Sequence, residues 1–254
     1  MNQIDKYYMR MALNEALKGG SNVYPNPRVG ALIVKDNKIV SSGYHERFGG
    51  QHAEVIAINN MAPEISNATL YVTLEPCDHQ GKTKPCSEII DPKIINRVVI
   101  GTKDPNQLAS GSSKKLMEKG IQISENICGN ECRDINRRFF TFHEQKRPYV
   151  ILKMASTLDG FIAEIDGSSK WITNEDSRNS VHELRSTCDA ILVGRNTIQK
   201  DNPLLTSHGK GKNPKIVFFD RGHKIDKNSK VYQDNPIIFA GKNLFQKPRE
   251  NISN

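Results

Sequence analysis

Three potential metal ligands, set far apart along the chain, constrain the fold more than any other feature. His52 opens the tripeptide HAE, while Cys77 and Cys86 lie in the segment TLEPCDHQGKTKPC, residues 73–86. About 25 residues separate His52 from Cys77, and they read as one helix followed by one strand. If one metal ion binds all three side chains, that helix and strand must fold so as to bring them together.

The order of helical and strand patterns predicts a layered α/β arrangement in the first part of the chain. Apolar spacing predicts a first helix in IDKYYMRMALNEALKGG, and two apolar runs at residues 29–34 and 39–42 predict a β-hairpin. Helices and strands then alternate. We expect helices in HAEVIAINNMAP, from Cys86 onward, in SSKKLMEKG and in GNECRDINRRFFTFHEQK, and strands in ATLYVTL, INRVVIGT and IQISENI.

A domain boundary is predicted near Lys146, where EQKRP has the character of a linker. A new run of strands and helices is expected to begin with YVILKMASTLDGFIA. The length of 254 residues is compatible with roughly one to two domains. We therefore divide the chain into residues 1–145 and 146–254.

The residue types suit a catalytic zinc ion. Such a site takes three protein ligands and leaves a fourth position for water, whose pKa the metal lowers. His52, Cys77 and Cys86 would supply one nitrogen and two thiolates, and the predicted helix start at Cys86 favours its thiolate. Glu54, two residues beyond the histidine, is placed to shuttle a proton from that water to the leaving nitrogen without being a ligand.

The combined pattern is more specific than its parts. H-x-E alone and two PC pairs alone are weak signals, but together they match the signature of zinc deaminases. The spacing departs from that signature, which has two residues between the cysteines where this chain has eight. Two buried free thiols and a helix-capping glutamate remain the alternative reading of the same residues.

Composition limits the classes of partner. The formal charge is +8 and the mean hydropathy is −0.56, which favours a solvated basic surface that suits a phosphorylated small molecule rather than a nucleic-acid partner. There is no run of 18 apolar residues and no apolar leader at the start, so we expect neither a membrane span nor a secretory signal. Five cysteines in a chain of this kind favour a cytoplasmic location, with metal binding or chemistry rather than disulfides.

The segments PNPRVG, HAE and TLEPCDHQGKTKPC together resemble the deaminase half of the riboflavin-biosynthesis bifunctional deaminase–reductases. The resemblance implies a cytidine deaminase-like three-layer αβα domain with a mixed sheet of about five strands. It also implies hydrolytic deamination of 2,5-diamino-6-(5-phosphoribosylamino)pyrimidin-4-one. The family places zinc at the positions of His52, Cys77 and Cys86, and its proton donor corresponds to Glu54.

The same resemblance implies substrate-binding residues near the metal. They are Asn26, His79, Lys82 and Thr83. Each has a plainer reading: an asparagine between prolines often makes only an Asx turn, and a loop histidine or lysine is often solvated. Cys128, Cys132 and Cys188 are expected to be free thiols.

The second part of the chain resembles the reductase half of the same family in YVILKMASTLDGFIA, GSSKWIT and ILVGRNTIQKDNPLLT. The resemblance implies a partial dihydrofolate reductase-like α/β domain that uses NADPH to reduce the ribosyl group. The implied cofactor-side residues are Ala155, Trp171, Thr197 and Asp201. The implied substrate-side residues are Ser169, Arg185 and Leu205.

The reductase half is expected to be shortened and therefore vestigial, truncated or completed by another chain. The sequence has no glycine-rich loop of the kind whose backbone amides hold a cofactor's phosphates. Self-association is expected from the resemblance. Two alternatives to the pyrimidine deaminase stay open, namely a deaminase acting on tRNA or a nucleoside, and a binding module with a purely structural zinc.

Overall fold

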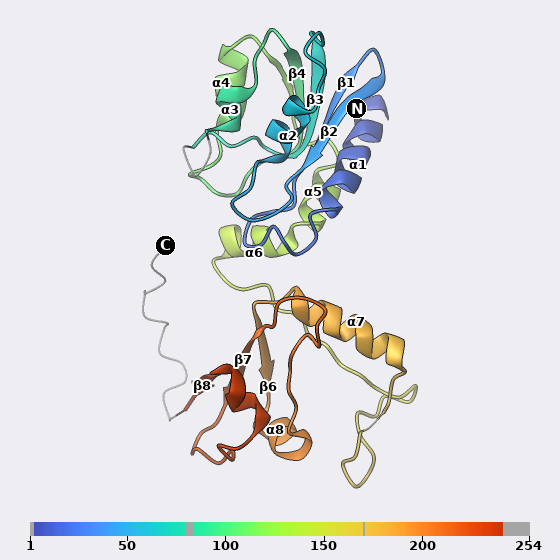
Figure 1. Ribbon diagram of the computed structural model, residues 1–254, viewed down its shortest axis with the longest axis vertical. Helices are drawn as coiled ribbons and strands as arrows, with labels where there is room; N and C mark the ends of the chain where they lie inside the picture. Colours follow the sequence, from blue (N-terminus) through green and yellow to red (C-terminus); the bar gives the residue numbers. More distant parts are fainter. Residues whose placement is uncertain (1–2, 80–83, 170, 241–254) are drawn as a thin grey trace. The chain divides into compact units, whose positions relative to one another are not determined.

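The chain forms two compact units, Met1–Ile151 and Leu152–Asn254. Figure 1 shows their elements in a computed structural model, which describes residues 3–79, 84–169 and 171–240. The division falls just beyond the linker predicted at Lys146. Within the described residues, the helices are too short or too polar to span a lipid bilayer.

A five-stranded mixed sheet forms the centre of the first unit, with the strand order β2-β1-β3-β4-β5. β1 pairs antiparallel with β2 and β3, while β3, β4 and β5 run parallel. The strands are β1 (Gly30–Lys35), β2 (Lys38–Tyr44), β3 (Ala68–Leu74), β4 (Ile95–Thr102) and β5 (Gln122–Ser124). The predicted hairpin and the three later strands of this unit are present.

Helices cover both faces of this sheet (Figure 1). α1 (Gln3–Leu17) and α5 (Gly129–Asp134) contribute to the core on one face. α2 (Ala53–Asn59), α4 (Ser112–Glu118) and residues beside α3 (Cys86–Ile89) contribute to the core on the other. The result is the expected three-layer αβα arrangement.

Alternating burial explains why the central strands read as continuous apolar runs. In β1, Ile33 packs into the core beneath α2, whereas Leu32 packs into the core beneath α1. β3 repeats the pattern with Leu70 and Tyr71. Because successive side chains point to opposite faces of a sheet, a sheet covered on both sides needs apolar residues at nearly every position.

Close packing of α1 against β1 depends on Gly30. A Cβ atom at this position would lie 2.1 Å from the carbonyl oxygen of Ala12, far inside van der Waals contact. The absence of a side chain therefore lets the helix backbone approach the first residue of the strand.

The single basic helix predicted over residues 129–146 is wrong, because the chain breaks it into α5 and α6 (Arg137–Gln145). Asn136 lies at the break. Its side chain accepts a hydrogen bond from the backbone N–H of Arg28 and donates one to the carbonyl of Arg28, both at 2.8 Å. This long-range clamp outweighs the local helical preference and ties the helix break to the loop that carries Asn26.

The second unit is built on a three-stranded parallel sheet of order β6-β7-β8. Its elements are α7 (Glu175–Ser186), β6 (Ala190–Val193), α8 (Arg195–Asp201), β7 (Lys215–Phe219), the 3-10 helix η1 (Lys230–Asp234) and β8 (Ile237–Phe239). Ile198, Ile216 and Phe218 lie in its core. The strand expected in YVILKMASTLDGFIA does not form. Its apolar side chains Leu152 and Met154 are 83% and 66% exposed, so they lack the packing that would stabilise a strand.

An ion pair with a buried carboxylate fixes α1 to the sheet. The carboxylate of Asp5 accepts hydrogen bonds from both terminal nitrogens of Arg97 on β4, at 2.9 and 2.8 Å. The hydroxyl of Tyr71 on β3 also donates to it at 2.9 Å. The Asp5 side chain is 5% exposed, and hydrogen bonding from Arg97 holds its pKa below its usual range despite the opposing effect of burial.

We expect Asp5→Asn to lower the free energy of unfolding near neutral pH by about 1–3 kcal/mol, because Arg97 loses a charged acceptor. The carboxylate's contribution is present above its unfolded pKa of about 3.9 and is lost as the pH falls through the lower folded pKa. Urea denaturation of both proteins at about pH 7 and about pH 3 should therefore show a difference that shrinks in acid. Equal stabilities near neutral pH would contradict this role.

Candidate active site

The three potential ligands lie at the ends of three elements in the first unit. His52 is the residue before α2, Cys77 follows the end of β3, and Cys86 is the first residue of α3. Their donor atoms all lie within 4.8 Å of one another. The alternation of helix and strand thus brings together side chains that are 34 residues apart in sequence.

The separations fit a tetrahedral zinc ion. His52 Nδ1 lies 3.2 Å from Cys86 Sγ and 3.4 Å from Cys77 Sγ. Zinc bonds of about 2.3 Å to sulfur and 2.0–2.1 Å to nitrogen would place those atoms about 3.6 Å apart in a tetrahedron. Small side-chain movements would therefore bring all three donors into bonding distance of a common ion.

Close approach of the three ligands strongly shifts their pKa values. Hydrogen bonding with Cys86 lowers the pKa of the Cys77 thiol to about 4, and the same interaction raises the pKa of Cys86. Hydrogen bonding to Cys77 raises the pKa of His52 to about 9. Zinc binds these groups in their deprotonated forms, so its affinity for the site should fall as the pH is lowered.

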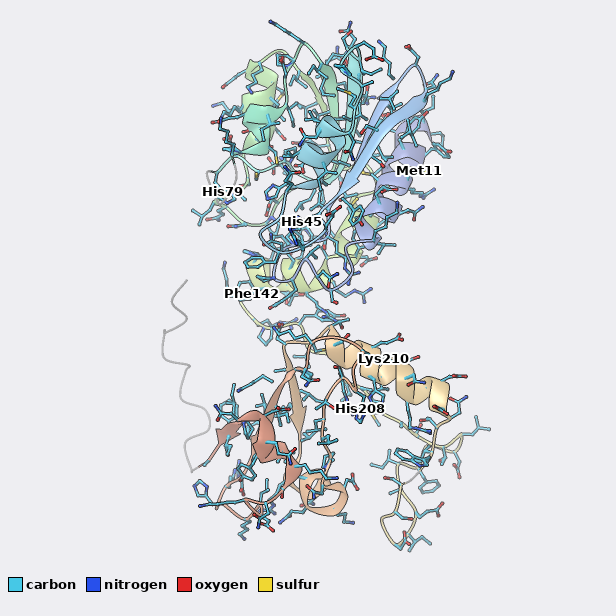
Figure 2. All side chains as sticks on the ribbon, viewed as in Figure 1. Met11, His45, His79, Phe142, His208 and Lys210 are labelled. Atoms are coloured by element: carbon cyan, nitrogen blue, oxygen red, sulfur yellow. The ribbon has the colours of Figure 1, made fainter. Side chains whose placement is uncertain are left out.

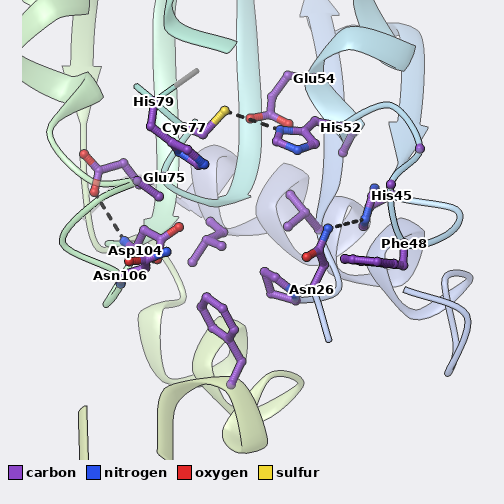
Figure 3. Close-up of a pocket in the computed structure, with 18 residues that line it drawn as sticks. Asn26, His45, Phe48, His52, Glu54, Glu75, Cys77, His79, Asp104 and Asn106 are labelled. Atoms are coloured by element: carbon purple, nitrogen blue, oxygen red, sulfur yellow. Dashed lines mark hydrogen bonds between the residues drawn. The ribbon is translucent and has the colours of Figure 1, made fainter. Parts of the chain in front are cut away.

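Glu54 lies in the first turn of α2, two residues from His52, and is 3% exposed. Its side chain lines the same cavity as His52 and Cys77 (Figure 3). Burial raises the pKa of Glu54, and the nearby His52 ring opposes that shift. A carboxyl group with a raised pKa, placed beside the ligands, is suited to accept and return a proton.

Hydrogen bonds close the base of the eight-residue loop between the cysteines. Asp78 and Ser87, the residues after the two cysteines, are joined through their side chains. The backbone N–H of Ser87 also donates to the carbonyl of Cys77 at 3.2 Å. The long spacing is therefore compatible with one metal site, because the loop ends are fixed independently of the residues between them.

Two lysines, one in α4 and one directly after it, attach this closed base to the rest of the unit. Lys115 Nζ lies 2.9 Å from the Asp78 carboxylate and 3.5 Å from that of Glu88. Lys119 Nζ donates to the carbonyl of Ser87 at 2.6 Å. We call Asp78, Ser87, Lys115 and Lys119 the loop clip.

A cavity of about 280 Å³ opens beside the ligands. Its polar lining residues are Asn26, His45, His52, Glu54, Glu75, Cys77, His79, Asp104 and Asn106. Of the four residues expected to bind substrate, Asn26 and His79 therefore line it. Lys82 and Thr83 lie outside the described residues.

A hydrogen-bonded histidine holds Asn26 at the cavity wall. The Asn26 amide nitrogen lies 3.1 Å from His45 Nε2, and His45 Nδ1 lies 2.9 Å from the carbonyl oxygen of Gln51. Since that carbonyl only accepts, Nδ1 carries the proton, and Nε2 accepts from Asn26. Burial lowers the pKa of His45, which favours this neutral ring. The arrangement leaves the side-chain oxygen of Asn26 as an acceptor for another group.

Asp104 and Asn106 form part of another wall and were not identified from the sequence. Figure 3 shows them across the cavity from His45 and Phe48. Burial raises the pKa of Asp104 to about 6. They follow β4 directly, and polar residues after the end of a strand in an α/β fold are the signal that could have indicated them. His45 directly follows β2 and carried the same signal, whereas Phe48 is apolar and carried none.

The residues expected to serve the reductase half lie on several parts of the second unit. Trp171 is 70% exposed, with the Arg178 guanidinium 4.5 Å from its ring centroid. Leu205 is buried in the core. Ala155 and Ser169 are half-buried, whereas Thr197 and Asp201 are exposed on α8. No hydrogen bond or ring contact found in the described ranges joins Ala155, Trp171, Thr197 or Asp201 to one another.

Arg185 belongs to a cluster of basic side chains on α7 and the loop after Leu205. Its Nη1 donates to the carbonyl of Thr206 at 3.2 Å, while its buried Nε has no hydrogen-bond partner within the described part of the chain. On the same helix, the His182 ring lies with its centroid 4.1 Å from that of His208 and is tilted by 36° to it, and His208 lies close to Lys210 (Figure 2). Burial lowers the pKa of His182, and the nearby charges of Arg185, Lys210 and Arg178 act in the same direction. Such a cluster of basic side chains is suited to bind an anion.

Comparison with known families assigns both parts of the chain. Residues 2–102 match the cytidine and deoxycytidylate deaminase zinc-binding region, and residues 148–252 match the RibD C-terminal domain. The riboflavin biosynthesis protein RibD of Aquifex aeolicus is 50% identical over 207 residues, which are 81% of this chain and 58% of that protein. The chain thus spans less than two thirds of the length of this relative.

Solved structures extend the comparison to the whole fold. The diaminohydroxyphosphoribosylaminopyrimidine deaminase/5-amino-6-(5-phosphoribosylamino)uracil reductase of Thermotoga maritima is 43% identical, with a TM-score of 0.85. The match covers 93% of this chain and 69% of that one. The chain belongs to the RibD family. A RibD structure from Acinetobacter baumannii agrees, at 34% identity and a TM-score of 0.84 over 94% of this chain and 69% of that one. Membership in this family accounts for the order of the two units, in which the match to the deaminase zinc-binding region precedes the match to the RibD C-terminal domain.

We expect Asp78→Ala to weaken zinc binding about tenfold, the lower end of the range for residues that support metal ligands. The substitution removes both the Ser87 and the Lys115 partner of the loop clip. Zinc affinity is measured by competition with a chromophoric chelator. Glu88→Ala is the matched control, because Glu88 also pairs with Lys115 but has no described contact with Ser87. Equal zinc affinities in the wild type, Asp78→Ala and Glu88→Ala would show that the loop clip does not support the metal site.

Proposed function

We propose that the domain predicted over residues 1–145, which lies within the first unit, is a zinc-dependent deaminase that hydrolyses 2,5-diamino-6-(5-phosphoribosylamino)pyrimidin-4-one in riboflavin biosynthesis. The observation that carries this proposal is the convergence of His52, Cys77 and Cys86 beside Glu54 at a single cavity. The names of the matched relatives support the substrate. The cavity volume of about 280 Å³ is near the lower end of the range for small-molecule sites, about 300–1,000 Å³.

In this proposal His52, Cys77 and Cys86 hold the zinc ion. When bound, zinc supplies Lewis acidity that lowers the pKa of an attacking water. Glu54 takes a proton from the water as the C–O bond forms at C2 of the pyrimidine, the ring carbon that loses its amino group. It then delivers a proton to the departing nitrogen as the C–N bond breaks, so that ammonia leaves and an aminouracil remains.

The remaining polar wall residues are proposed to orient the substrate. Asn26, fixed through its amide nitrogen by His45, presents its side-chain oxygen to a donor on the pyrimidine. His79, Asp104 and Asn106 offer further hydrogen-bonding groups. Lys82 and Thr83 are proposed substrate ligands from the family pattern alone. Orienting contacts of this kind lower the barrier by restricting the substrate before reaction.

We expect Glu54→Gln to lower ammonia release by at least about 100-fold, the lower end of the range for a general acid–base group. The amide preserves the shape of the side chain but does not cycle a proton. Ammonia release from the pyrimidine substrate and zinc content are measured together. Unchanged zinc with lost turnover is the expected result. Retained turnover would point to a different proton carrier or to a purely structural metal.

The domain predicted over residues 146–254 is proposed to be reductase-like, with Ala155, Trp171, Thr197 and Asp201 on the NADPH side. Ser169, Arg185 and Leu205 are proposed to lie on the substrate side. The buried, unpartnered Nε of Arg185 and the surrounding cations support a phosphate-binding role for that residue. Self-association and a cytoplasmic location remain predictions.

We expect the chain to oxidise NADPH much more slowly than it releases ammonia. The sequence has no glycine-rich loop to hold the cofactor's phosphates. The loss of NADPH absorbance is followed after addition of the deaminated product, with the deaminase assay as a control for active protein. Oxidation at a rate similar to deamination would contradict this expectation.

A further inference from the structure

Glu75 is a buried carboxylate next to the candidate metal site, and the proposed mechanism uses it neither as a metal ligand nor as a proton carrier. Glu75 directly follows β3 and is 5% exposed. One of its oxygens accepts the backbone N–H of Asp104 at 3.3 Å, and the other accepts that of Gly111 at 3.0 Å. Longer contacts of 3.5 Å reach the hydroxyl of Ser112 and the N–H of Ser113.

These donors lie at the two ends of one loop. The loop joins β4 to α4 and spans residues 103–111. Asp104 is near its start, and Gly111 is its last residue, with a φ of +102°. No side chain within the loop caps α4, whose first N–H groups lack partners within the helix. Glu75 therefore joins the beginning of the loop to its end through a single carboxylate.

The same loop carries Asp104 and Asn106 to the cavity. Within it, Asp104 Oδ1 accepts the Asn106 N–H at 2.8 Å, and Asn106 Oδ1 accepts the Leu108 N–H at 3.2 Å. Figure 3 shows the hydrogen bond that the Glu75 carboxylate accepts from the backbone N–H of Asp104. The positions of the two cavity side chains thus depend on a backbone that the Glu75 carboxylate holds.

A charged acceptor is well suited to this role. Hydrogen bonds from backbone N–H groups to a buried carboxylate are stronger than those to a neutral acceptor. A buried carboxylate in turn requires several donors to offset its loss of hydration. The loop and the carboxylate therefore stabilise each other, and the loop geometry is set before any substrate enters.

We propose that Glu75 is a positioning residue of the deaminase site, which holds the 103–111 loop so that Asp104 and Asn106 meet the substrate. The inference rests on the proposed function of the first unit. Glu75 acts through the loop and does not touch the substrate's reacting atoms. Its loss should weaken substrate binding more than it slows the chemical step.

Glu75→Gln in the full chain tests the proposal. The amide keeps the size of the side chain but replaces one acceptor oxygen with a donor, which disfavours one of the two N–H contacts. We expect KM for the pyrimidine to rise about tenfold, equivalent to about 1.4 kcal/mol, with kcat and zinc content nearly unchanged. Hydrogen exchange measured by mass spectrometry should quicken in peptides that contain residues 104–113.

Two further variants separate positioning from general stability. Glu118→Gln removes an exposed carboxylate of α4 and should leave KM and loop exchange unchanged. Asn106→Ala should raise KM by itself. Its effect should shrink in the Glu75→Gln background, because the two substitutions disturb the same contact with the substrate.

An unchanged rate of hydrogen exchange in the 103–111 loop of Glu75→Gln would overturn the proposal. Loss of zinc from this variant, or a fall in its kcat at constant KM, would also overturn it. The same holds if the effects of Glu75→Gln and Asn106→Ala on KM are fully additive. Hydrogen exchange reports on the loop even if the wild-type chain releases no ammonia from the pyrimidine. That outcome would refute the proposed substrate instead, so the two failures are distinguishable.

Discussion

The candidate site depends on the packing of α2 and α3 beside the end of β3. His52 precedes α2, Cys77 follows β3 and Cys86 begins α3, so a small shift of any one element would separate the donor atoms. The core between the helices and the sheet, which includes Ala53, Ala57 and Val72, fixes these elements. Hydrophobic burial thus sets the distances on which the metal chemistry depends.

Hydrogen bonds from residues near the ligands extend this order into the cavity. His45 fixes Asn26 on one wall, and Glu75 holds the loop of Asp104 on another. Asn136 clamps the backbone of Arg28, two residues beyond Asn26, and thereby connects that wall to the start of α6. Each contact joins segments distant in sequence, so the site is supported by the whole first unit rather than by its motifs alone.

The sequence predicted the layered fold and the succession of helices and strands along the first part of the chain, because apolar runs in a covered sheet are strong local signals. It could not predict the break at Asn136, which is caused by a contact 108 residues away. It also missed His45, Asp104 and Asn106, which follow β2 and β4, because the sequence does not show which of the loops after strands meet at one cavity. Residues 149–163 read as apolar and strand-like but form no strand in the second unit, because pattern alone does not supply a packing partner.

The most direct test of the account is zinc X-ray absorption spectroscopy of the metal-loaded protein. The account predicts a first coordination shell with two sulfur atoms at about 2.3 Å and lighter atoms at about 2.0–2.1 Å. Cys86→Ala should reduce the sulfur count to one. A shell made only of nitrogen and oxygen, or a sulfur count unaffected by that substitution, would contradict the proposed ligands.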